Sequence, residues 1–380
     1  MGGDQTKPNK ETLLMAIVLI QMPSVNPDPT ELGRPQECPR CGCEILQRWG
    51  IVSKPVRDTE WEEVQVYRYR CTQCKHTFRH YPQGVDRADQ SKRLRCLAAM
   101  AWSMGLSLRG VGVIFSAFGE GLGVSKSSVW RATQEMGEQL RRRANATQSK
   151  HKVKVLGVDG AWIRLNGETT GVMVAVDMGD GQMVSMEVVD EHDPQAVCRW
   201  LKPLVEEYGV EVIVTDDLTT YNTVEQDLGV DRQICYFHMR RWVGRALDNL
   251  EKKLAVEEGW PDWPGVIAEV RWLVEEMPQK GDERLMELWQ QVQKECGPRH
   301  PKEEATPLQR LAGLIVQLME NWGHYRFYLT EKGAELGVPA TNNLTEQMIG
   351  NGKVRSRTVR GYKSKQGVLA AFVVCAARFA

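Results

Sequence analysis

Two C-x-x-C motifs near the N-terminus constrain the fold of this chain more than any other sequence feature. Each motif turns tightly enough to direct two thiolates at one ion, and four thiolates are the ligand set of a structural zinc site. A polar segment of this length has little apolar core of its own, so a metal is needed to fold it. We therefore predict a zinc ribbon over residues 34–85, with unrelated free thiols as the alternative. The expected zinc ligands are Cys38, Cys41, Cys71 and Cys74.

Two nearby residues, Cys43 and His76, are alternative zinc ligands. Four protein ligands leave no open coordination position, so the expected zinc is structural and takes no part in catalysis. The Arg and Tyr residues between the two motifs could contact a phosphate backbone or could simply be solvated on an exposed hairpin.

The apolar runs of the chain are short, which bears on its compartment. No stretch reaches the roughly 18 apolar residues of a membrane span. The longest candidate, Leu13 to Met22, also lacks the basic start and the cleavage site of a signal peptide. We therefore expect a cytoplasmic protein whose ten cysteines are thiols and metal ligands more than disulfides.

A net charge of zero conceals an uneven distribution of charge. Residues 34–150 carry 20 Lys and Arg against 11 Asp and Glu, and residues 347–380 carry 7 against none. Residues 151–346, which lie between them, carry 20 against 34. Two basic regions that flank an acidic one suit a polyanion bound at both ends of the chain.

The segments on either side of the ribbon differ in pattern. Residues 1–33 read as an N-terminal arm that ends in a proline-rich linker. Residues 86–148 show helical periodicity, and Ser107 and Ser125 stand where helix N-caps are expected. The run around Ser125 is typical of the recognition helix of a helix-turn-helix, which predicts a domain that binds double-stranded DNA; a plain helical linker is the alternative. The expected DNA contacts here are Lys126, Ser127, Ser128, Arg131, Arg141, Arg142 and Arg143.

Five strand-like runs follow an expected linker at residues 144–150, and their order predicts the fold class. Three strands, then helix, strand, helix and strand, is the order of a ribonuclease H-like α/β fold, in which an antiparallel meander is extended by parallel strands into a mixed five-stranded sheet. We expect this catalytic domain over residues 149–380. The expected strands are 153–159, 169–178, 182–189, 210–215 and 233–237, and the expected helices are 194–208 and about 220–228.

Two of these expected strands end in a carboxylate. Asp159 ends the first strand between two glycines that permit close approach, and Asp216 ends the fourth, which lies beside the first in this topology. The two acids could share Mg²⁺ or Mn²⁺, and a pair of such ions activates a water or a 3′-hydroxyl for attack on a phosphodiester. Asp217 is the main alternative for the second acid and Asp177 a weaker alternative for the first. Without partners, Asp159 would merely open a turn.

A third acid is expected from a later helix, and Glu346 stands at the start of one. Its three-residue separation from Asn343 also fits a capping box, which is the structural alternative. The residues after Glu346 are basic, and they would neutralise phosphates near the acids or form a solvated helix face. The expected phosphate contacts are Lys353, Arg355, Arg357, Arg360 and Lys363.

Four motifs in this order resemble those of the DDE transposases of bacterial insertion sequences, and most closely those of the Mutator-like branch. The motifs are V-D-G-A-W at Asp159, V-T-D-D-L-T-T-Y at Asp216, C-Y-F-H at Cys235 to His238, and T-N-N-L-T-E at Glu346. The resemblance spans roughly residues 34–380. It implies that Asp159, Asp216 and Glu346 bind the catalytic metal and that Cys235 and His238 support the site.

The resemblance also implies an architecture and an activity. Residues 240–335 are expected to form an all-helical insertion between the fifth strand and the final helix. The protein is expected to be a nucleoid-associated enzyme that binds the terminal inverted repeats of its element as a homodimer or larger assembly, cleaves DNA there and joins it to a target. A related metal-dependent nuclease or resolvase without strand transfer, and a zinc-ribbon regulator with an inactive catalytic body, are the alternatives.

Overall fold

The computed structural model describes residues 19–20, 22–119, 121–148, 152–256, 260–297, 304–359, 361–376 and 378–379. Their contacts divide the chain into two compact units, which we describe separately. Unit 1 contains residues 148–161 and 171–347, and unit 2 contains 16–147, 162–170 and 348–380. Most of the predicted N-terminal arm lies outside the described residues.

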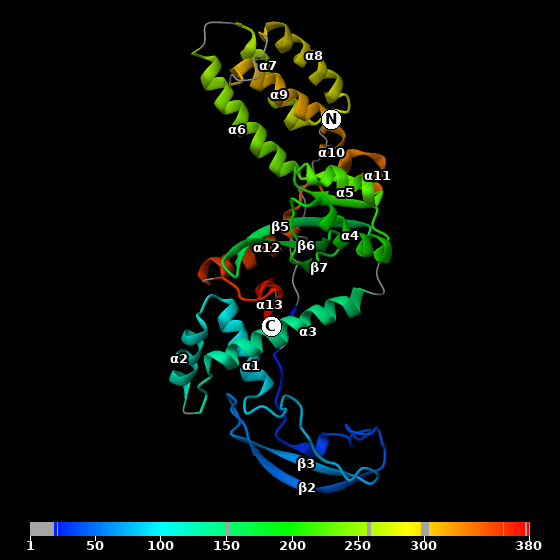
Figure 1. Ribbon diagram of the computed structural model, residues 1–380, viewed down its shortest axis with the longest axis vertical. Helices are drawn as coiled ribbons and strands as arrows, with labels where there is room; N and C mark the ends of the chain where they lie inside the picture. The colour runs from blue at the N-terminus through cyan, green and yellow to red at the C-terminus, as the bar shows by residue number, and fades with distance from the viewer. Residues whose placement is uncertain are drawn as a thin grey trace, which may run out of the picture. The chain divides into compact units, whose positions relative to one another are not determined.

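A mixed five-stranded sheet is the centre of unit 1, and Figure 1 shows α4 and α5 beside it. The predicted succession of three strands, helix, strand, helix and strand is confirmed. In the sheet, β5 and β8 pair in parallel, as do β8 and β9, whereas β6 and β7 are antiparallel. The strand order is β7-β6-β5-β8-β9. The elements are β5 (Val155–Leu165), β6 (Glu168–Asp177), β7 (Met183–Glu187), α4 (Pro194–Tyr208), β8 (Val212–Thr215), α5 (Thr220–Leu228) and β9 (Asp231–Ile234).

Alternate residues of the central strands face opposite sides of this sheet, as the two-residue period of a strand requires. Leu156 and Val158 join a core with α4 and α5 on one face. Val155 packs on the other face with Val212 and Val214 of β8. Because both faces are covered, β8 and the first four residues of β5 are buried throughout, whereas Trp162 and Arg164 near the end of β5 are exposed.

Two strand ends differ from the prediction. Strand β5 does not stop at Asp159 but continues to Leu165, where Asn166 and Gly167, with φ values of 53° and 94°, turn the chain into β6. The neighbouring strand β8 ends at Thr215, so Asp159 in the middle of β5 lies beside the end of β8. Strand β9 ends at Ile234, three residues earlier than predicted, because the next helix begins at Tyr236.

Helices occupy the part of unit 1 that was predicted to be a helical insertion. Figure 1 shows α6, α7, α8 and α9 packed together, and their apolar faces form one core with Trp322 and Tyr325. Trp272 is exposed, whereas Trp242, Trp260, Trp263 and Trp289 pack against this core. The elements are α6 (Tyr236–Leu254), α7 (Trp263–Glu276), α8 (Gly281–Glu295), α9 (Pro307–Glu320), α10 (Trp322–Tyr325), η3 (Phe327–Leu329) and α11 (Glu331–Glu335).

Unit 2 begins with a three-stranded antiparallel sheet over the predicted ribbon. Its small core of valines, from Val25 to Val85, is closed by Tyr81. A core of this size leaves much of the fold to be held by the cysteines at one end of the sheet. The strands are β2 (Leu46–Pro55), β3 (Glu63–Cys71) and β4 (Thr77–His80), preceded by η2 (Pro29–Glu31). A separate two-stranded pairing joins β1 (Leu19–Ile20) to β10 (Arg378–Phe379).

The helices of unit 2 begin at serine N-caps. Ser107 accepts a hydrogen bond from the Gly110 amide, and Ser125 accepts one from the Ser128 amide, as predicted from the sequence. Helix α3 then runs to Gln148 and takes up most of the predicted linker. Within the described residues, no helix is long and apolar enough to span a membrane. The helices are α1 (Lys92–Ser103), α2 (Leu108–Phe118), α3 (Lys126–Gln148) and α13 (Lys365–Ala376); α12 (Asn343–Thr358) links the two units.

Candidate active site

Asp159 and Asp216 lie together because the strands that carry them are neighbours. The pairing of β5 and β8 ends with Gly157 opposite Val214, and two further residues along each segment bring Asp159 level with Asp216. Both acids share the strand face of Val155, Val212 and Val214, since residues two apart point the same way. Their carboxylate oxygens lie within 4.8 Å of one another.

Glu191 completes a group of three carboxylates with Asp159 and Asp216, all within that 4.8 Å limit. It lies between β7 and α4, is buried, and accepts a hydrogen bond from the Tyr221 hydroxyl at 2.9 Å. Gly160 permits this approach, because a Cβ there would lie 2.5 Å from Glu191 Oε2. The sequence reasoning missed Glu191, since an acid in a loop among other acids has no periodic signal.

Asp216 has the features of an anionic ligand held ready for a cation. Burial raises the pKa of its carboxyl above the ordinary value. Its Oδ1 is buried and accepts no hydrogen bond within the described part of the chain. A buried carboxylate oxygen without a donor is costly unless a cation completes its environment. The donor set of the group, carboxylate oxygens alone, fits Mg²⁺ or Mn²⁺.

The loop that presents Asp216 is fixed from below by Arg232 on β9. This guanidinium is buried, and it donates to the backbone oxygen of Asp216 at 2.8 Å and to the Thr215 hydroxyl at 2.9 Å. It also donates to Asn222 Oδ1 at 2.6 Å. The Arg232 side chain therefore ties the end of β8 to the start of α5. It fixes the backbone at Asp216 and so sets where the Asp216 carboxylate lies.

Asp217, the main alternative for the second acid, is engaged elsewhere. Its Oδ2 accepts hydrogen bonds from the Tyr325 hydroxyl and from Gln317 Nε2, the latter at 3.3 Å. Both donors belong to the helical part of unit 1, α9 and α10. Because successive residues after a strand point in different directions, the Asp217 carboxylate contacts these helices and the Asp216 carboxylate does not. Of the pair, Asp216 is the one beside Asp159.

Glu346, the predicted third acid, contacts Cys235 and His238 instead of joining the group that contains Glu191. Its Oε1 lies 3.7 Å from His238 Nε2 and 3.9 Å from the Cys235 sulfur. Because β9 ends early, Cys235 caps α6 and His238 falls in its first turn, so both side chains reach Glu346. Contact with Cys235 raises the pKa of His238 to about 9 against the effect of burial, helped by the charges of Glu346 and Asp216.

The start of α12 is pressed against β5 at Gly157. A Cβ on Gly157 would lie 2.4 Å from Thr345 Oγ1 and 2.7 Å from Asn342 Oδ1. Asn342 Nδ2 donates to the backbone oxygen of Val158 at 2.9 Å. The glycines on both sides of Asp159 therefore each admit a neighbour: Gly157 admits the segment that carries Glu346, and Gly160 admits Glu191.

The four predicted zinc ligands come together in unit 2, with all four sulfurs within 4.8 Å of one another. The Cys38 and Cys74 sulfurs are 3.7 Å apart, and those of Cys41 and Cys71 are 3.6 Å apart. Of the alternative ligands, Cys43 contacts the Ile45 carbonyl and His76 stacks on Phe78, and neither belongs to the group. Four converging thiols make a metal-binding cluster.

The residues predicted to contact DNA fall into three groups. Lys126, Ser127 and Arg131 are exposed at the start of α3, where Ser128 contributes to the cap. Arg141 and Arg142 pair with Glu138 one turn earlier, at 3.9 and 3.1 Å, which neutralises part of the basic run. Lys363 and Arg357 are exposed and Lys353 is half-buried. The side chain of Arg143, and Arg360 altogether, lie outside the described residues.

Arg355 has a different role from the predicted phosphate contact. It is 3% exposed, and its guanidinium lies 4.3 Å from the centre of the Trp102 ring. It donates to the backbone oxygens of Gly105 and Leu106, each at 2.9 Å. These are the residues of the α1–α2 turn, so Arg355 holds that turn to α12. A charge count along the chain does not distinguish such an arginine from a solvated one.

A cleft of about 790 Å³ in unit 2 brings the two basic regions of the sequence together. The starts of α2 and α3 form one wall, and the segment after α12 forms the other. Cationic, hydroxyl and indole groups line it, a combination suited to phosphates and bases. The residues that line it include Arg109, Lys126, Trp130, Arg131 and Lys363.

The model of the IS66 transposase family matches residues 94–369. Among solved structures, the chain is similar to the Drosophila P element transposase strand transfer complex, with a TM-score of 0.44 and 11% sequence identity, over 76% of this chain and 93% of that one. A search of curated proteins finds no match.

Proposed function

The chain belongs to the IS66 transposase family and is a DNA transposase, and we propose that Asp159, Asp216 and Glu346 are its catalytic acids. The family match carries this proposal, since residues 94–369 include all three positions. The proximity of Asp159 and Asp216 on neighbouring strands supports it. Glu346 is favoured over Glu191 as the third acid because its side chain is 30% exposed, whereas Glu191 is buried and engaged by Tyr221.

These acids would hold Mg²⁺ or Mn²⁺ through carboxylate oxygens. Two such ions would supply activation of a water or 3′-hydroxyl and stabilisation of the leaving oxygen of a phosphodiester. The protein's part is to keep the acids in place: Arg232 fixes the Asp216 loop, and Gly157 lets the start of α12 approach β5. His238, which is cationic when its pKa is near 9, balances the carboxylates beside it.

Recognition of the element's ends is assigned to unit 2. The cleft formed by α2, α3 and the segment after α12 would bind double-stranded DNA through Arg109, Lys126, Arg131 and Lys363. The four-cysteine cluster would bind structural Zn²⁺ and so hold the ribbon in shape for this contact.

Several finer features belong to the same proposal. The strand order and the acids on β5 and β8 favour a ribonuclease H-like sheet. We propose a ribbon over residues 34–85, a helix-turn-helix domain over 86–148 and a catalytic domain over 149–380 with a helical insertion at 240–335. We also propose kinship with the Mutator-like branch of transposases. A homodimer or larger assembly at the bacterial nucleoid would bring both ends of an element together.

One experiment tests the activity and the triad. The protein and an Asp159→Asn variant are incubated with Mg²⁺ and DNA that carries the gene's own flanking sequences. Cleaved and joined products from the wild type alone support the proposal. Cleavage without joining would make the protein a nuclease or resolvase, and bound but uncut DNA would make it a regulator; either result overturns it.

A further inference from the structure

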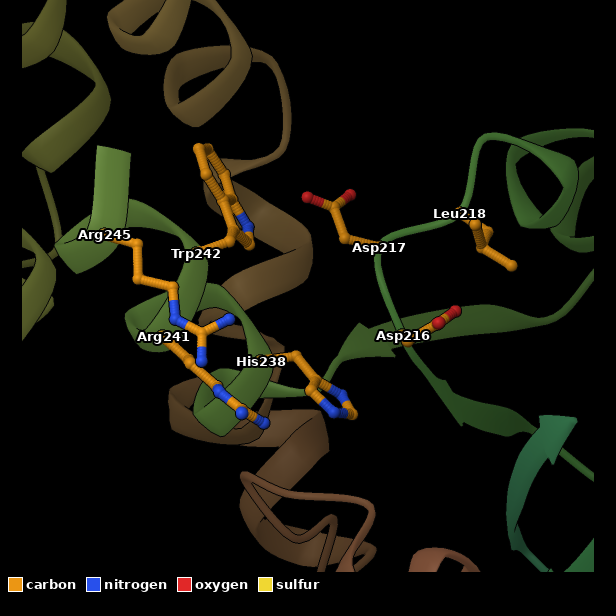
Figure 2. Close-up of a pocket in the computed structure, with 7 residues that line it drawn as sticks. All are labelled: Asp216, Asp217, Leu218, His238, Arg241, Trp242 and Arg245. Atoms are coloured by element: carbon orange, nitrogen blue, oxygen red, sulfur yellow. The ribbon is translucent and has the colours of Figure 1, made fainter. Parts of the chain in front are cut away.

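A pocket of about 470 Å³ opens beside the candidate acids, between the loop after β8 and helix α6. Figure 2 shows Asp216 and Asp217 on one side and the side chains of α6 on the other. The α6 residues are spaced at three and four positions, so they share one face of the helix. These residues are His238, Arg241, Trp242 and Arg245.

The charge of this face stands out against its surroundings. Arg241 and Arg245 are exposed, and neither side chain has an ion-pair or hydrogen-bond partner among the described residues. Four other arginines in the helical part of unit 1 are paired with carboxylates, and Arg326 donates to the Met277 backbone oxygen. Arg240 pairs with Glu275, Arg271 with Asp248 and Glu251, Arg284 with Glu269 and Glu287, and Arg310 with Glu304.

This contrast points to an anionic ligand. Residues 151–346 carry an excess of acids, so carboxylates are plentiful, yet these two guanidiniums are left without them. Their Cα atoms are about 6 Å apart along the helix axis, close to one turn, and both side chains line the same pocket as Asp216. Guanidinium groups bind phosphate oxygens with a geometry that a point charge lacks.

We infer that the Arg241–Arg245 face of α6 binds phosphates of the DNA strand whose scissile bond lies at the acids. The strand would follow α6 away from Asp216, because a second pocket continues along this helix with Trp242, Lys253 and Arg310 in its lining. Trp242, which lines both pockets, offers an indole for a base to stack on. Arg241 and Arg245 are thus positioning residues: they hold the strand while the acids do the chemistry. The inference rests on the proposed function.

The neighbouring Arg240 supplies a matched control. It lies on the same turn of α6 but pairs with Glu275 at 3.1 Å and does not line the pocket. Loss of Arg240 therefore removes one positive charge from the helix without touching the proposed strand path. Arg241→Gln/Arg245→Gln and Arg240→Gln are compared with the wild type as full chains, and thermal unfolding midpoints check that each variant folds.

The measured quantity is the salt dependence of affinity for a fluorescent DNA probe, the gene-flanking duplex, with Ca²⁺ as the divalent ion. Each lost phosphate contact lowers the slope of log K against log[salt] by about 0.9. We expect the slope of the double variant to be shallower than that of the wild type by about 1.8. The affinity lost relative to the wild type should therefore be about 60-fold greater at 0.1 M salt than at 1 M salt. Arg240→Gln should leave the slope near the wild-type value.

Three outcomes decide the inference. The expected pattern supports it. Equal slopes for all three proteins overturn it. A slope for Arg240→Gln as shallow as that of the double variant also overturns it, because it would show a general effect of helix charge and no specific phosphate site. Cleavage by the wild type in Mg²⁺ is scored separately: a protein that cuts but shows equal slopes retains the proposed function and loses only the strand path.

Discussion

At the scale of single residues, the candidate site contains one more acid than the triad needs. Glu191 and Glu346 approach the strand acids from different segments, one before α4 and the other at the start of α12. Glu191 is 5% exposed and bonded to Tyr221, whereas the Glu346 side chain is 30% exposed and faces His238. We propose that accessibility separates the two roles, because a residue that touches a DNA-bound ion must be reachable.

We expect Glu346→Gln to abolish cleavage and joining, and Glu191→Gln to slow both by about 10- to 100-fold, the usual cost of losing a group that supports metal ligands. Initial rates on gene-flanking DNA in Mg²⁺ measure this. Tyr221→Phe is the control, since it removes the donor to Glu191 and keeps the carboxylate. An inactive Glu191→Gln beside an active Glu346→Gln would reverse the assignment.

At the scale of elements, a buried carboxylate joins the ribbon to the first helix of unit 2. Asp58, in the β2–β3 connection, has a fully buried side chain and accepts hydrogen bonds from Ser91, Arg93 and the Glu60 amide. Ser91 is also the N-cap of α1, so Asp58 fixes where that helix begins. Burial acts to raise the pKa of Asp58, but the bonds from Arg93 and Ser91 outweigh it and hold the pKa below its ordinary value.

Asp58→Asn should therefore lower the free energy of unfolding of unit 2 by about 2–3 kcal/mol at pH 7, since buried donors lose a charged acceptor. Because the pKa of Asp58 is lower in the folded than in the unfolded protein, its carboxylate stabilises the fold fully at pH values above the unfolded pKa of about 3.9. This stabilisation is lost as the pH falls through the folded-state pKa. The gap between wild type and variant in urea titrations should shrink between pH 7 and pH 3.

The control for Asp58 is Glu60, which pairs with the same arginine at 2.7 Å but has a 61% exposed side chain. Glu60→Gln should cost less than about 1 kcal/mol, because exposed ion pairs contribute little. A gap between Asp58→Asn and the wild type that does not change with pH would contradict the carboxylate's role.

At the scale of the whole molecule, the two units depend on different forces. Unit 1 has large apolar cores on one face of its sheet and among its helices. The ribbon of unit 2 has a core of five buried valines, so we expect its stability to depend on a metal bound by the four-cysteine cluster. Loss of the metal should therefore unfold the ribbon and leave unit 1 folded.

We expect the purified protein to contain one zinc per chain by elemental analysis. Cys38→Ser should lose the zinc and the affinity for gene-flanking DNA while the main thermal transition of unit 1 remains. Cys43→Ser should keep the metal, because its sulfur contacts the Ile45 carbonyl and lies outside the cluster. Zinc lost equally from both variants would mean that the ligand set differs from the four predicted cysteines.

The local features of this protein follow from its sequence alone. The C-x-x-C spacing predicts the cysteine cluster, serine caps predict where α2 and α3 begin, and the alternation of strands and helices predicts the order of the sheet. Each of these depends on neighbours within a few residues or on a period of two or four. The acids Asp159 and Asp216 are predicted by the same kind of local signal, because each ends an apolar run of the sequence.

Tertiary structure decided which side chains meet across long separations. Glu191 joins the acids because Gly160 leaves room for it, and Asp217 turns to Tyr325. Arg355 is buried on Trp102, although its run of basic residues predicted a phosphate contact or a solvated helix face. Likewise, Arg241 and Arg245 line the pocket beside the acids, whereas Arg240 on the same helix pairs with Glu275. Burial and pairing are properties of two segments at once, so a pattern read along one segment does not contain them.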